Sequence, residues 1–321
     1  MKKALLYFFS ILILGISGLL IFVKTILPNV GQPEDVTAIS TPETIARGKY
    51  LAHAVAVCMD CHSTRDWSKF SGPLVEGTLG KGGEEFSQKY GFPGKYFSKN
   101  LTPFALKNWT DGEVLRAISS GVNKDGKALF PIMPHPNYGK LDKKDLLCII
   151  AYLRTLEPIE SEIPASTSDF PMNFILNTIP KKASFSQMPD PKDQLEYGAY
   201  LFTAASCNEC HTKQDKGTPI AGMELAGGFE FPLPYGGIVR SANITPDKET
   251  GIGNWSERLF VSRFKMYADS SYSPPSVEKG AFNSMMPWTM YADMKDDDLK
   301  AIYAYLMTQK PISNKVVKFS K

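Results

Sequence analysis

The amino-acid sequence predicts an all-α protein in which two similar helical units follow one N-terminal transmembrane helix. Three observations support this fold class. The chain opens with a long uncharged apolar run, the remainder repeats one pattern twice, and apolar residues recur at three- and four-residue spacing within each copy. Strand signals are weak throughout. The chain has 321 residues, enough for two domains of ordinary size.

The first segment, residues 1–27, is predicted to be a membrane anchor. Lys2 and Lys3 precede the uncharged run Ala4–Val23, and Lys24 closes it. Such a helix spans roughly 30 Å, the hydrocarbon thickness of a bilayer. A cleaved signal peptide has a shorter apolar core followed closely by a small-residue site, and none follows here, so an uncleaved anchor is favoured. The lysine pair should stay cytoplasmic, which sends the rest of the chain across the membrane.

The chain beyond the anchor is an internal repeat with a period of about 150 residues. The matched segments are Arg47–Ala52 with Tyr197–Phe202, Lys99–Pro103 with Ala242–Pro246, Asn108–Ile118 with Asn254–Phe264, Ile132–Tyr138 with Met285–Tyr291, and Leu141–Thr155 with Met294–Thr308. The second copy is longer between its tryptophan and methionine, and the extra residues form a loop around 268–280.

The repeat sets the expected domain boundaries. We expect an anchor at 1–27, a linker at 28–42, a first domain at 43–157, a linker at 158–192, a second domain at 193–313 and a tail at 314–321. The second linker is rich in Pro and Ser and should run over the surface.

Apolar spacing and capping signals place the main helices. Residues 43–57 and 193–206 should be helices that run into the cysteines. Thr110 begins a capping box, and Asp142 and Asp296 are the expected N-caps of the last helix in each copy. Two stretches rich in Gly and Pro, 76–86 and 229–239, are predicted to be loops.

Each copy contains one Cys-x-x-Cys-His pentapeptide, the attachment signature of c-type haem. The two thiols lie one helical turn apart, so both reach one edge of a porphyrin, and the adjacent histidine supplies the proximal ligand to iron. The sequence therefore predicts two covalently bound haem c groups. Their attachment residues are Cys58, Cys61 and His62 in the first copy and Cys207, Cys210 and His211 in the second.

Other uses of these cysteines explain less of the sequence. A thioredoxin-like motif usually follows a strand, whereas a helix precedes each motif here. A zinc site built from both cysteine pairs leaves the two histidines and the downstream repeat unexplained. Idle thiols in an oxidising compartment would pair as disulfides. The fifth cysteine, Cys148, lies among apolar residues and is expected in the core.

Met133 and Met286 are the expected sixth ligands of the two irons. Both fall at the same position of the repeat, and both precede a proline, which fixes an extended backbone suited to delivering a sulfur atom. Met285 is an adjacent alternative to Met286. His135 is a rival ligand for the first iron, and this choice stays open. His53 is expected to be exposed or structural.

Two further sets of residues recur in the repeat. Trp109 and Trp255, with Asn100 and Asn243, fit either hydrogen bonds to haem propionates or simple packing. Gly48 and Gly198, with Tyr152 and Tyr305, are typical of a helix crossing at which glycine admits a close neighbour.

These motifs resemble the class I cytochrome c domain. The tandem arrangement resembles the dihaem and trihaem cytochrome c subunits of membrane-bound alcohol and gluconate dehydrogenases. The likeness rests on "NITPDKETGIGNW", "MPHPNY", "AYLRTLEPI" and "DFPMNF", and it covers residues 43–313. It implies two tandem cytochrome c-like helical domains, electron transfer through covalent haem c, and Met133 and Met286 as axial ligands.

The expected function is a respiratory-chain electron carrier without catalytic residues of its own. It would relay single electrons from a dehydrogenase or quinol-oxidising complex to a terminal oxidase or other acceptor. It would be held in the bacterial inner membrane with its soluble domains on the periplasmic side. A net charge of +3 without a basic run gives no reason to expect a nucleic-acid partner. The alternatives are a dihaem peroxidase with one displaceable axial ligand and an anchoring subunit of a respiratory complex.

Overall fold

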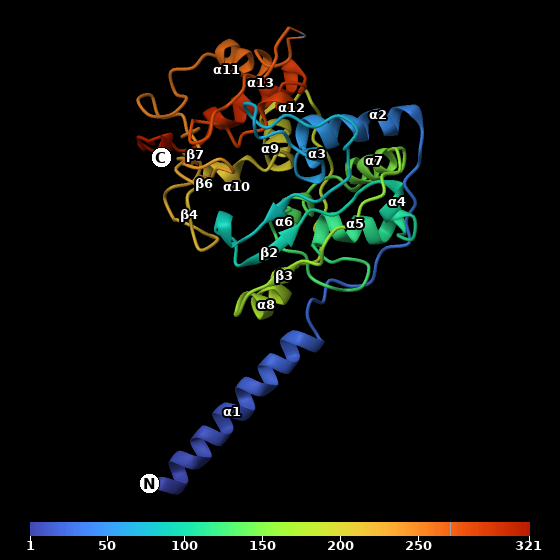
Figure 1. Ribbon diagram of the computed structural model, residues 1–321, viewed down its shortest axis with the longest axis vertical. Helices are drawn as coiled ribbons and strands as arrows, with labels where there is room; N and C mark the ends of the chain where they lie inside the picture. The colour runs from blue at the N-terminus through green and yellow to red at the C-terminus, as the bar shows by residue number, and fades with distance from the viewer. Residues whose placement is uncertain (270) are drawn as a thin grey trace.

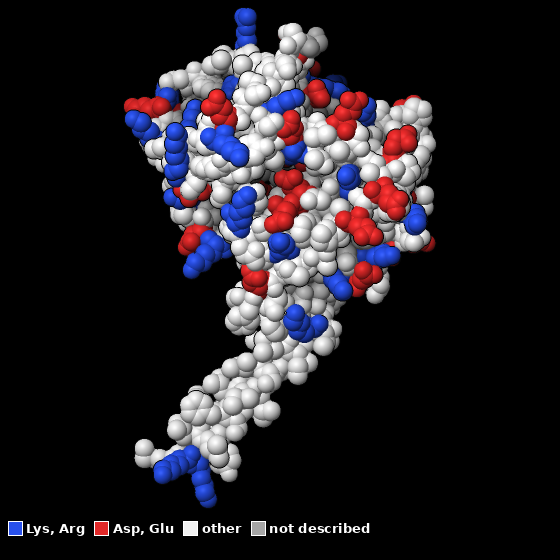
Figure 2. Space-filling model, viewed as in Figure 1, with Lys and Arg blue, Asp and Glu red and all other residues white. Residues whose placement is uncertain are grey.

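The computed structural model describes residues 1–269 and 271–321 and consists of a two-unit body with one long projecting helix (Figure 1). This helix, α1, spans Lys2–Thr25, and only Val23 on it is buried. Figure 2 shows its uncharged surface between lysines at the far end and the mixed charges of the body. The predicted N-terminal apolar helix is confirmed.

Among the described residues, α1 is the one helix long and apolar enough to cross a membrane, with a mean hydropathy of 2.5 in its most apolar window. Its 24 residues extend about 36 Å, which matches or exceeds the hydrocarbon thickness of a bilayer. Length and composition alone fit a membrane anchor and a signal sequence equally.

The first unit is built around two packed helices near its ends, α2 and α7. Its helical elements are α2 (Pro42–Tyr50), the π-helical turn η1 (Leu51–Val55), α3 (Cys58–His62), the 3-10 turn η2 (Gln88–Tyr90), α4 (Pro103–Leu106), α5 (Asp111–Ser120), α6 (His135–Tyr138) and α7 (Lys143–Leu153). The predicted helix over 43–57 is therefore present, but its last turn is wound as a π-helix.

The second unit repeats this order with α9 and α13 as the packed pair. Its helices are α9 (Gln194–Ala204), α10 (Cys207–His211), α11 (Glu257–Lys265), α12 (Trp288–Tyr291) and α13 (Asp296–Met307). The connector between the units contains a short helix α8 (Met172–Ile175) and a 3-10 turn η3 (Leu176–Thr178).

The expected helix caps are mostly confirmed. The capping box at α5 has both of its bonds, from the Glu113 N–H to Thr110 Oγ1 (3.1 Å) and from the Thr110 N–H to Glu113 Oε2 (2.8 Å). Asp142 accepts from the Lys144 N–H at 2.8 Å at the start of α7. The expected cap at Asp296 is wrong, because Lys295 occupies the N-cap position of α13. Asp296 is the first helical residue, where its charge still complements the helix dipole.

The predicted all-α fold class is wrong, because the described residues also contain three small antiparallel sheets. The first sheet joins β1 (Glu85–Phe86), β2 (Gly94–Phe97) and β3 (Thr167–Ser168), the second joins β4 (Gln214–Asp215) and β5 (Thr218–Pro219), and the third joins β6 (Glu230–Pro232), β7 (Ile238–Arg240) and β8 (Phe319–Ser320). Strands of two to four residues are too short for alternating polarity to reveal them.

The strands also depend on distant partners. β3 lies in the connector and β8 at the end of the chain, and each adds to a hairpin within the preceding unit, through the pairs Lys95↔Thr167 and Val239↔Phe319. Both hairpins extend into stretches that were predicted as loops from their Gly and Pro content. A ladder held by long-range pairing leaves no local sequence signal, which is why composition misassigned these stretches.

The two units share one continuous hydrophobic core. Leu146 and Ile150 of α7, Leu201 of α9 and Leu299 of α13 are all almost fully buried within it. Cross-unit hydrogen bonds surround this core with approximate two-fold symmetry. The Tyr50 hydroxyl donates to Asp298 at the start of α13, and the equivalent Tyr200 hydroxyl donates to Asp145 at the start of α7 (2.7 Å). The two units are therefore packed together into one body.

Candidate haem-binding sites

Each Cys-x-x-Cys-His pentapeptide forms its own single helical turn, α3 in the first unit and α10 in the second. A residue with a left-handed backbone precedes each turn, Val57 with φ 42° and Ser206 with φ 52°. Such a conformation costs roughly 1–3 kcal/mol for a residue other than glycine and is typical of functional sites. The sharp change of direction places both cysteines of each motif on one face of the turn.

Both motif histidines make the same kind of hydrogen bond, from the ring to a backbone carbonyl. Nδ1 of His62 lies 2.6 Å from the Lys99 carbonyl oxygen, and Nδ1 of His211 lies 2.7 Å from the Ala242 carbonyl oxygen. Because a carbonyl can only accept, Nδ1 must carry the hydrogen, and Nε2 is left with a free lone pair. This tautomer is the one that ligates a metal through Nε2 while the other nitrogen orients the ring.

The surroundings of these side chains fit a haem. Desolvation lowers the pKa of His62 and of His211, which favours the neutral, metal-binding form of each ring. Desolvation also raises the pKa of Cys58 and of Cys207 to about 12, so both remain thiols. Although protein atoms crowd these groups, all four side chains retain accessible surface. Partial exposure of the attachment residues is compatible with a large planar group bound against them.

The competing uses of the cysteines find no support in the geometry. All five cysteines are unpaired, so the motifs do not form disulfides. Among the described residues, no three His, Cys, Asp or Glu side chains gather in a way that could hold a metal ion. Cys148 lies on α7 and is only partly buried, so the expected buried core position is wrong.

A matching set of hydrogen bonds surrounds each motif. The Gly82 N–H donates to the His62 carbonyl, and the Gly227 N–H donates to the His211 carbonyl, both at 2.8 Å. The Tyr138 hydroxyl donates to the Ala56 carbonyl just before the first motif (3.2 Å). In the second unit, Tyr291 donates to the Ala205 carbonyl (3.0 Å). Sequence reasoning missed these tyrosines, although their recurrence in the repeat was a signal.

The tyrosines tie the two Met-Pro segments to the motifs. Tyr138 closes α6 and Tyr291 closes α12, the short helices that begin directly after Met133-Pro134 and Met286-Pro287. Met133 and Met286 are both partly buried against the core. The structure thus gives the two methionines equivalent positions beside equivalent motifs.

The other two histidines have separate environments. His135 begins α6 and is only 1 % exposed, with its ring against the backbone at Gly121 and no hydrogen-bond partner for Nε2. His53 is half-buried, and its Nε2 lies 2.6 Å from the Tyr152 hydroxyl oxygen. The structural role expected for His53 therefore agrees with its contacts.

The recurring asparagines have structural roles. Asn100 Oδ1 accepts from the Thr102 N–H (2.8 Å), and its Nδ2 donates to the Ile159 carbonyl (2.7 Å). Asn243 makes the same two bonds, to Thr245 and Ile312 (2.9 and 2.8 Å). Both asparagines are buried, and these bonds brace the end of each unit. Trp109 and Trp255 are half-buried against the hydrophobic core, which agrees with a packing role.

The two candidate sites lie next to each other at the boundary between the units. Asn137 of α6 donates through Nδ2 to Glu209 Oε1 (3.1 Å), which lies inside the second motif. Asn137 Nδ2 also donates to Ser206 Oγ (3.3 Å), directly before that motif. The α6 segment of the first unit is therefore in direct contact with the second motif.

Comparison with known proteins agrees with these observations. Residues 195–310 match the cytochrome c family. The chain is similar to the cytochrome c subunit of alcohol dehydrogenase (quinone) from Gluconacetobacter polyoxogenes, with 25% identity over 285 residues that cover 84% of this chain and 56% of that protein. It is similar to the gluconate 2-dehydrogenase cytochrome c subunit of Pantoea cypripedii, with 26% identity over 280 residues, 82% of this chain and 58% of that protein.

A third relative is a diheme cytochrome c-type protein of Cereibacter sphaeroides, with 26% identity over 260 residues that cover 78% of this chain and 80% of that protein. The chain spans a little over half the length of the two dehydrogenase subunits. The predicted resemblance to cytochrome c subunits of membrane-bound dehydrogenases is confirmed. The cytochrome c domain in the second unit implies covalently bound haem c.

Proposed function

We propose that this chain, with its cytochrome c domain and its similarity to cytochrome c subunits of dehydrogenases, is a membrane-anchored dihaem c-type cytochrome that relays single electrons. The observation that carries the proposal is the duplicated site. Two Cys-x-x-Cys-His turns have the same left-handed entry, the same histidine-orienting carbonyl and the same tyrosine contact to a Met-Pro segment. Such agreement between the units supports a haem in each.

The attachment residues follow from the two motifs. Cys58 and Cys61 would hold the first haem with His62 as its proximal ligand, and Cys207, Cys210 and His211 would do the same for the second. When bound, each haem supplies an iron centre that accepts and returns one electron. The chain orients the two proximal rings through the carbonyls of Lys99 and Ala242.

The axial methionines are proposed from the packing. Met133 keeps accessible surface, as His62 does, whereas His135 is almost completely enclosed by protein. This supports Met133 over His135 as the sixth ligand of the first iron. Met286 occupies the equivalent position in the second unit and packs against the core. Methionine ligation raises the reduction potential and closes the iron to small molecules.

Partners and location are proposed from the relatives and the anchor. The named relatives are subunits of dehydrogenases, which supports a membrane-bound dehydrogenase as the electron donor. A quinol-oxidising complex is the other donor we consider, and a terminal oxidase is the proposed acceptor. Helix α1, with Lys2 and Lys3 on its cytoplasmic side, would hold the body at the periplasmic face of a bacterial inner membrane.

An absorption spectrum combined with a redox titration of the purified holoprotein tests this function. We expect two low-spin haems per chain and the charge-transfer band of methionine-ligated iron. A high-spin haem that reacts with peroxide would instead favour the peroxidase alternative.

The variant Met286→Ala should remove one of the two high-potential transitions, because the second iron loses its sulfur ligand. Met285→Ala is the matched control and should leave both transitions in place. Two unchanged transitions in Met286→Ala would contradict the ligand assignment.

A further inference from the structure

Two loops that differ between the repeats meet across the boundary of the units. In the first unit, the chain from His62 to Gly82 is longer than the equivalent chain from His211 to Gly227, and it includes residues 65–72, which we call the clamp loop. In the second unit, the extra loop precedes the Met-Pro segment. The Phe70 N–H donates to the Pro275 carbonyl (2.8 Å), and the Val277 N–H donates to the Ser68 carbonyl (2.7 Å).

One side chain of the clamp loop reaches the backbone of the proposed axial methionine. Ser71 is 1 % exposed, and its Oγ donates to the carbonyl oxygen of Met286 at 2.6 Å. The same Oγ accepts from the Trp288 N–H at 3.0 Å. The Ser71 hydroxyl therefore binds the backbone on both sides of Pro287, at the point where the chain turns from Met286 into α12.

Asn283, which is also buried, braces the same contact from the second unit. Its Oδ1 accepts from the N–H groups of Ser71 (2.8 Å) and Ser284 (2.7 Å). Its Nδ2 donates to the carbonyls of Trp67 (3.3 Å) and Lys69 (3.2 Å) in the clamp loop. All polar atoms of this amide are thus used in joining the two loops.

The clamp loop is in turn tied to the first motif. Arg65 forms an ion pair of 2.9 Å with Asp60, which lies between Cys58 and Cys61, and both side chains are almost completely shielded from solvent. The Arg65 guanidinium also donates to the carbonyl of Ser71 (2.8 Å). A continuous set of contacts therefore runs from the first haem-attachment turn to the carbonyl of Met286.

The first unit has no such arrangement. The Met133 carbonyl accepts from the His135 N–H (2.7 Å), but within residues 1–269 and 271–321 no side chain is hydrogen-bonded to it. Among the described residues, a side-chain hydrogen bond to the carbonyl of the proposed axial methionine is therefore found at the second site alone.

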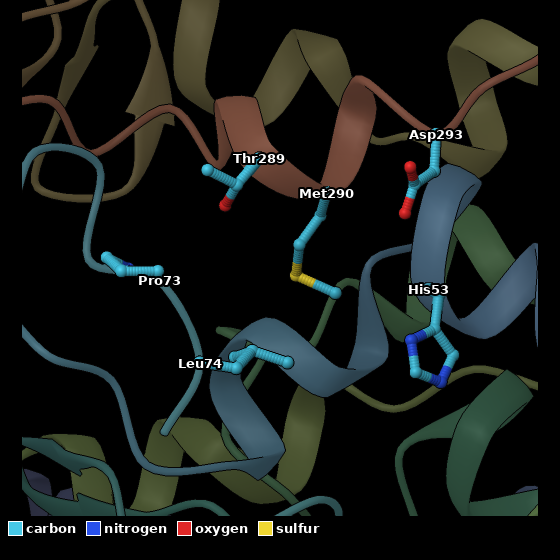
Figure 3. Close-up of a pocket in the computed structure, with 6 residues that line it drawn as sticks. All are labelled: His53, Pro73, Leu74, Thr289, Met290 and Asp293. Carbon is cyan, nitrogen blue, oxygen red and sulfur yellow. The ribbon is translucent and has the colours of Figure 1, made fainter. Parts of the chain in front are cut away.

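A hollow lies beside the clamp loop, next to the α12 segment whose start Ser71 binds. A hollow of about 220 Å³ lies between the clamp side of the first unit and α12, lined by Pro73 and Leu74 on one side and by Thr289 and Met290 on the other. Figure 3 shows Met290 pointing from α12 into this hollow, with Leu74 opposite. Because the α12 segment borders this hollow, the Ser71 hydrogen bonds hold the backbone at Met286 in addition to the packing of its side chain against the core.

We propose that Ser71 is a positioning residue, supplied by the first unit, which fixes Met286 as the axial ligand of the second haem. This rests on the proposed function, in which Met286 binds the second iron. The first domain thereby controls ligation, and so the reduction potential, in its neighbour.

Imidazole binding to the ferric holoprotein tests this role, followed through loss of the methionine–iron band. Loss of one buried hydrogen bond corresponds to about tenfold in an equilibrium constant. Ser71→Ala should therefore let imidazole replace one of the two methionines at about tenfold lower concentration, and one reduction potential should fall. Ser71→Gly is the second variant, because glycine adopts the left-handed backbone of this position (φ 64°) freely and removes only the hydroxymethyl group.

Tyr50→Phe is the matched control, because it removes two hydrogen bonds between the units, one to Asp298 and one from the Lys295 N–H, without touching the Met286 segment. It should leave imidazole binding unchanged. Equal changes at both haems in the Ser71 variants, or the same change in Tyr50→Phe, would overturn the positioning role. The positioning role would also be overturned if imidazole removed the methionine–iron band of the Ser71 variants at the same concentration as that of the wild-type protein. If the wild-type protein lacks the band, ligation by Met286 fails, and the positioning role fails with it.

A second, independent observation concerns the connector beside α1. The last turn of α1 is bound to α8 and η3, through Lys24 Nζ to the Asn173 carbonyl (2.9 Å) and Asn177 Nδ2 to the Val23 carbonyl (3.1 Å). Next to these bonds, Phe170 is 82 % exposed and Ile175 is 44 % exposed. Figure 1 shows α8 at the end of the body that faces α1.

We infer that this apolar patch, Phe170 with Ile175, rests in the surface of the lipid bilayer that α1 enters. This also rests on the proposed function, through α1 as an anchor. The bonds to Lys24 and Val23 place the patch where α1 leaves the hydrocarbon, and large apolar side chains at that level gain by partial burial. The patch would hold the body in one orientation against the membrane.

Quenching by brominated phosphatidylcholine in nanodiscs tests this contact on the full chain. Phe170→Trp should add tryptophan emission that brominated lipid quenches, beyond the wild-type signal. Val317→Trp is the control, because Val317 is exposed and near the C-terminus, which Figure 1 places away from α8. Equal quenching in both variants, or none in Phe170→Trp, would overturn the contact while leaving the anchor intact. Chains that fail to enter nanodiscs would overturn the anchor and the contact together.

Discussion

The four histidines of the chain show how the partner atoms decide the role of one residue type. His62 and His211 each present Nε2 because a carbonyl takes the hydrogen of Nδ1. His135 is enclosed by protein, and His53 is occupied by the hydroxyl of Tyr152. Only the first two combine a fixed tautomer with accessible surface, and they are the two that the motifs identified.

The pH dependence of stability should carry a contribution from His53. Desolvation, and then the charge of Lys49, lower its pKa below the ordinary value of 6.5, and the carboxylate of Asp293 opposes this only in part. The unfolded chain therefore binds the proton first as the pH falls through 6.5, and the free energy of unfolding should decrease there. Denaturant unfolding at pH 7.5 and 5.5, followed by circular dichroism, measures the effect.

The variant His53→Gln is the control for this slope. Glutamine can still bond to the Tyr152 hydroxyl but does not titrate, so the difference in stability between the two pH values should become smaller. An identical slope in the variant and the wild-type protein would show that other groups cause the pH dependence.

At the level of elements, the helix crossings are the clearest consequence of single residues. A Cβ added at Gly48 would lie 1.8 Å from the Cys148 carbonyl oxygen, and one at Gly198 would lie 2.0 Å from that of Ala301. The expected crossing of first and last helices is present in both units. In each unit the atom nearest to the glycine is a backbone carbonyl oxygen of the last helix. The tyrosine, Tyr152 or Tyr305, lies beside that carbonyl.

Gly198→Ala should therefore destabilise the protein by about 1–3 kcal/mol, because α9 and α13 must separate, and this outweighs the helix propensity of alanine. Thermal or denaturant unfolding of the holoprotein measures the change. Gly15→Ala is the control, since no atom lies within 4 Å of its added Cβ. Equal stability of the two variants would contradict a close crossing at Gly198.

The strands are the elements that local sequence could not reveal. β2 pairs with a segment of the connector and β7 pairs with the last residues of the chain, so their formation depends on contacts between distant segments. The helices were predicted better, because their signals are local: a capping box at Thr110, a cap at Asp142 and apolar spacing in α9.

At the scale of the whole molecule, duplication produces a body with approximate two-fold symmetry. The Tyr50–Asp298 and Tyr200–Asp145 bonds are related by this symmetry, and a shared core lies between them. The two candidate haem sites meet at the same boundary, where Asn137 contacts Glu209. An electron relay in series needs two haem sites at a fixed separation. The clamp loop departs from the two-fold symmetry, because only the first unit has it.

The sequence by itself determined the apolar N-terminal helix, the duplicated order of the units and the two Cys-x-x-Cys-His motifs. Each of these is written in contiguous residues or in a spacing that repeats along the chain. Only the tertiary structure decided that Nδ1 of each motif histidine meets a carbonyl, that short strands join the connector and the tail to the units, and that Ser71 reaches Met286. These contacts join residues from distant parts of the chain, and their geometry exists only once both units have packed against each other.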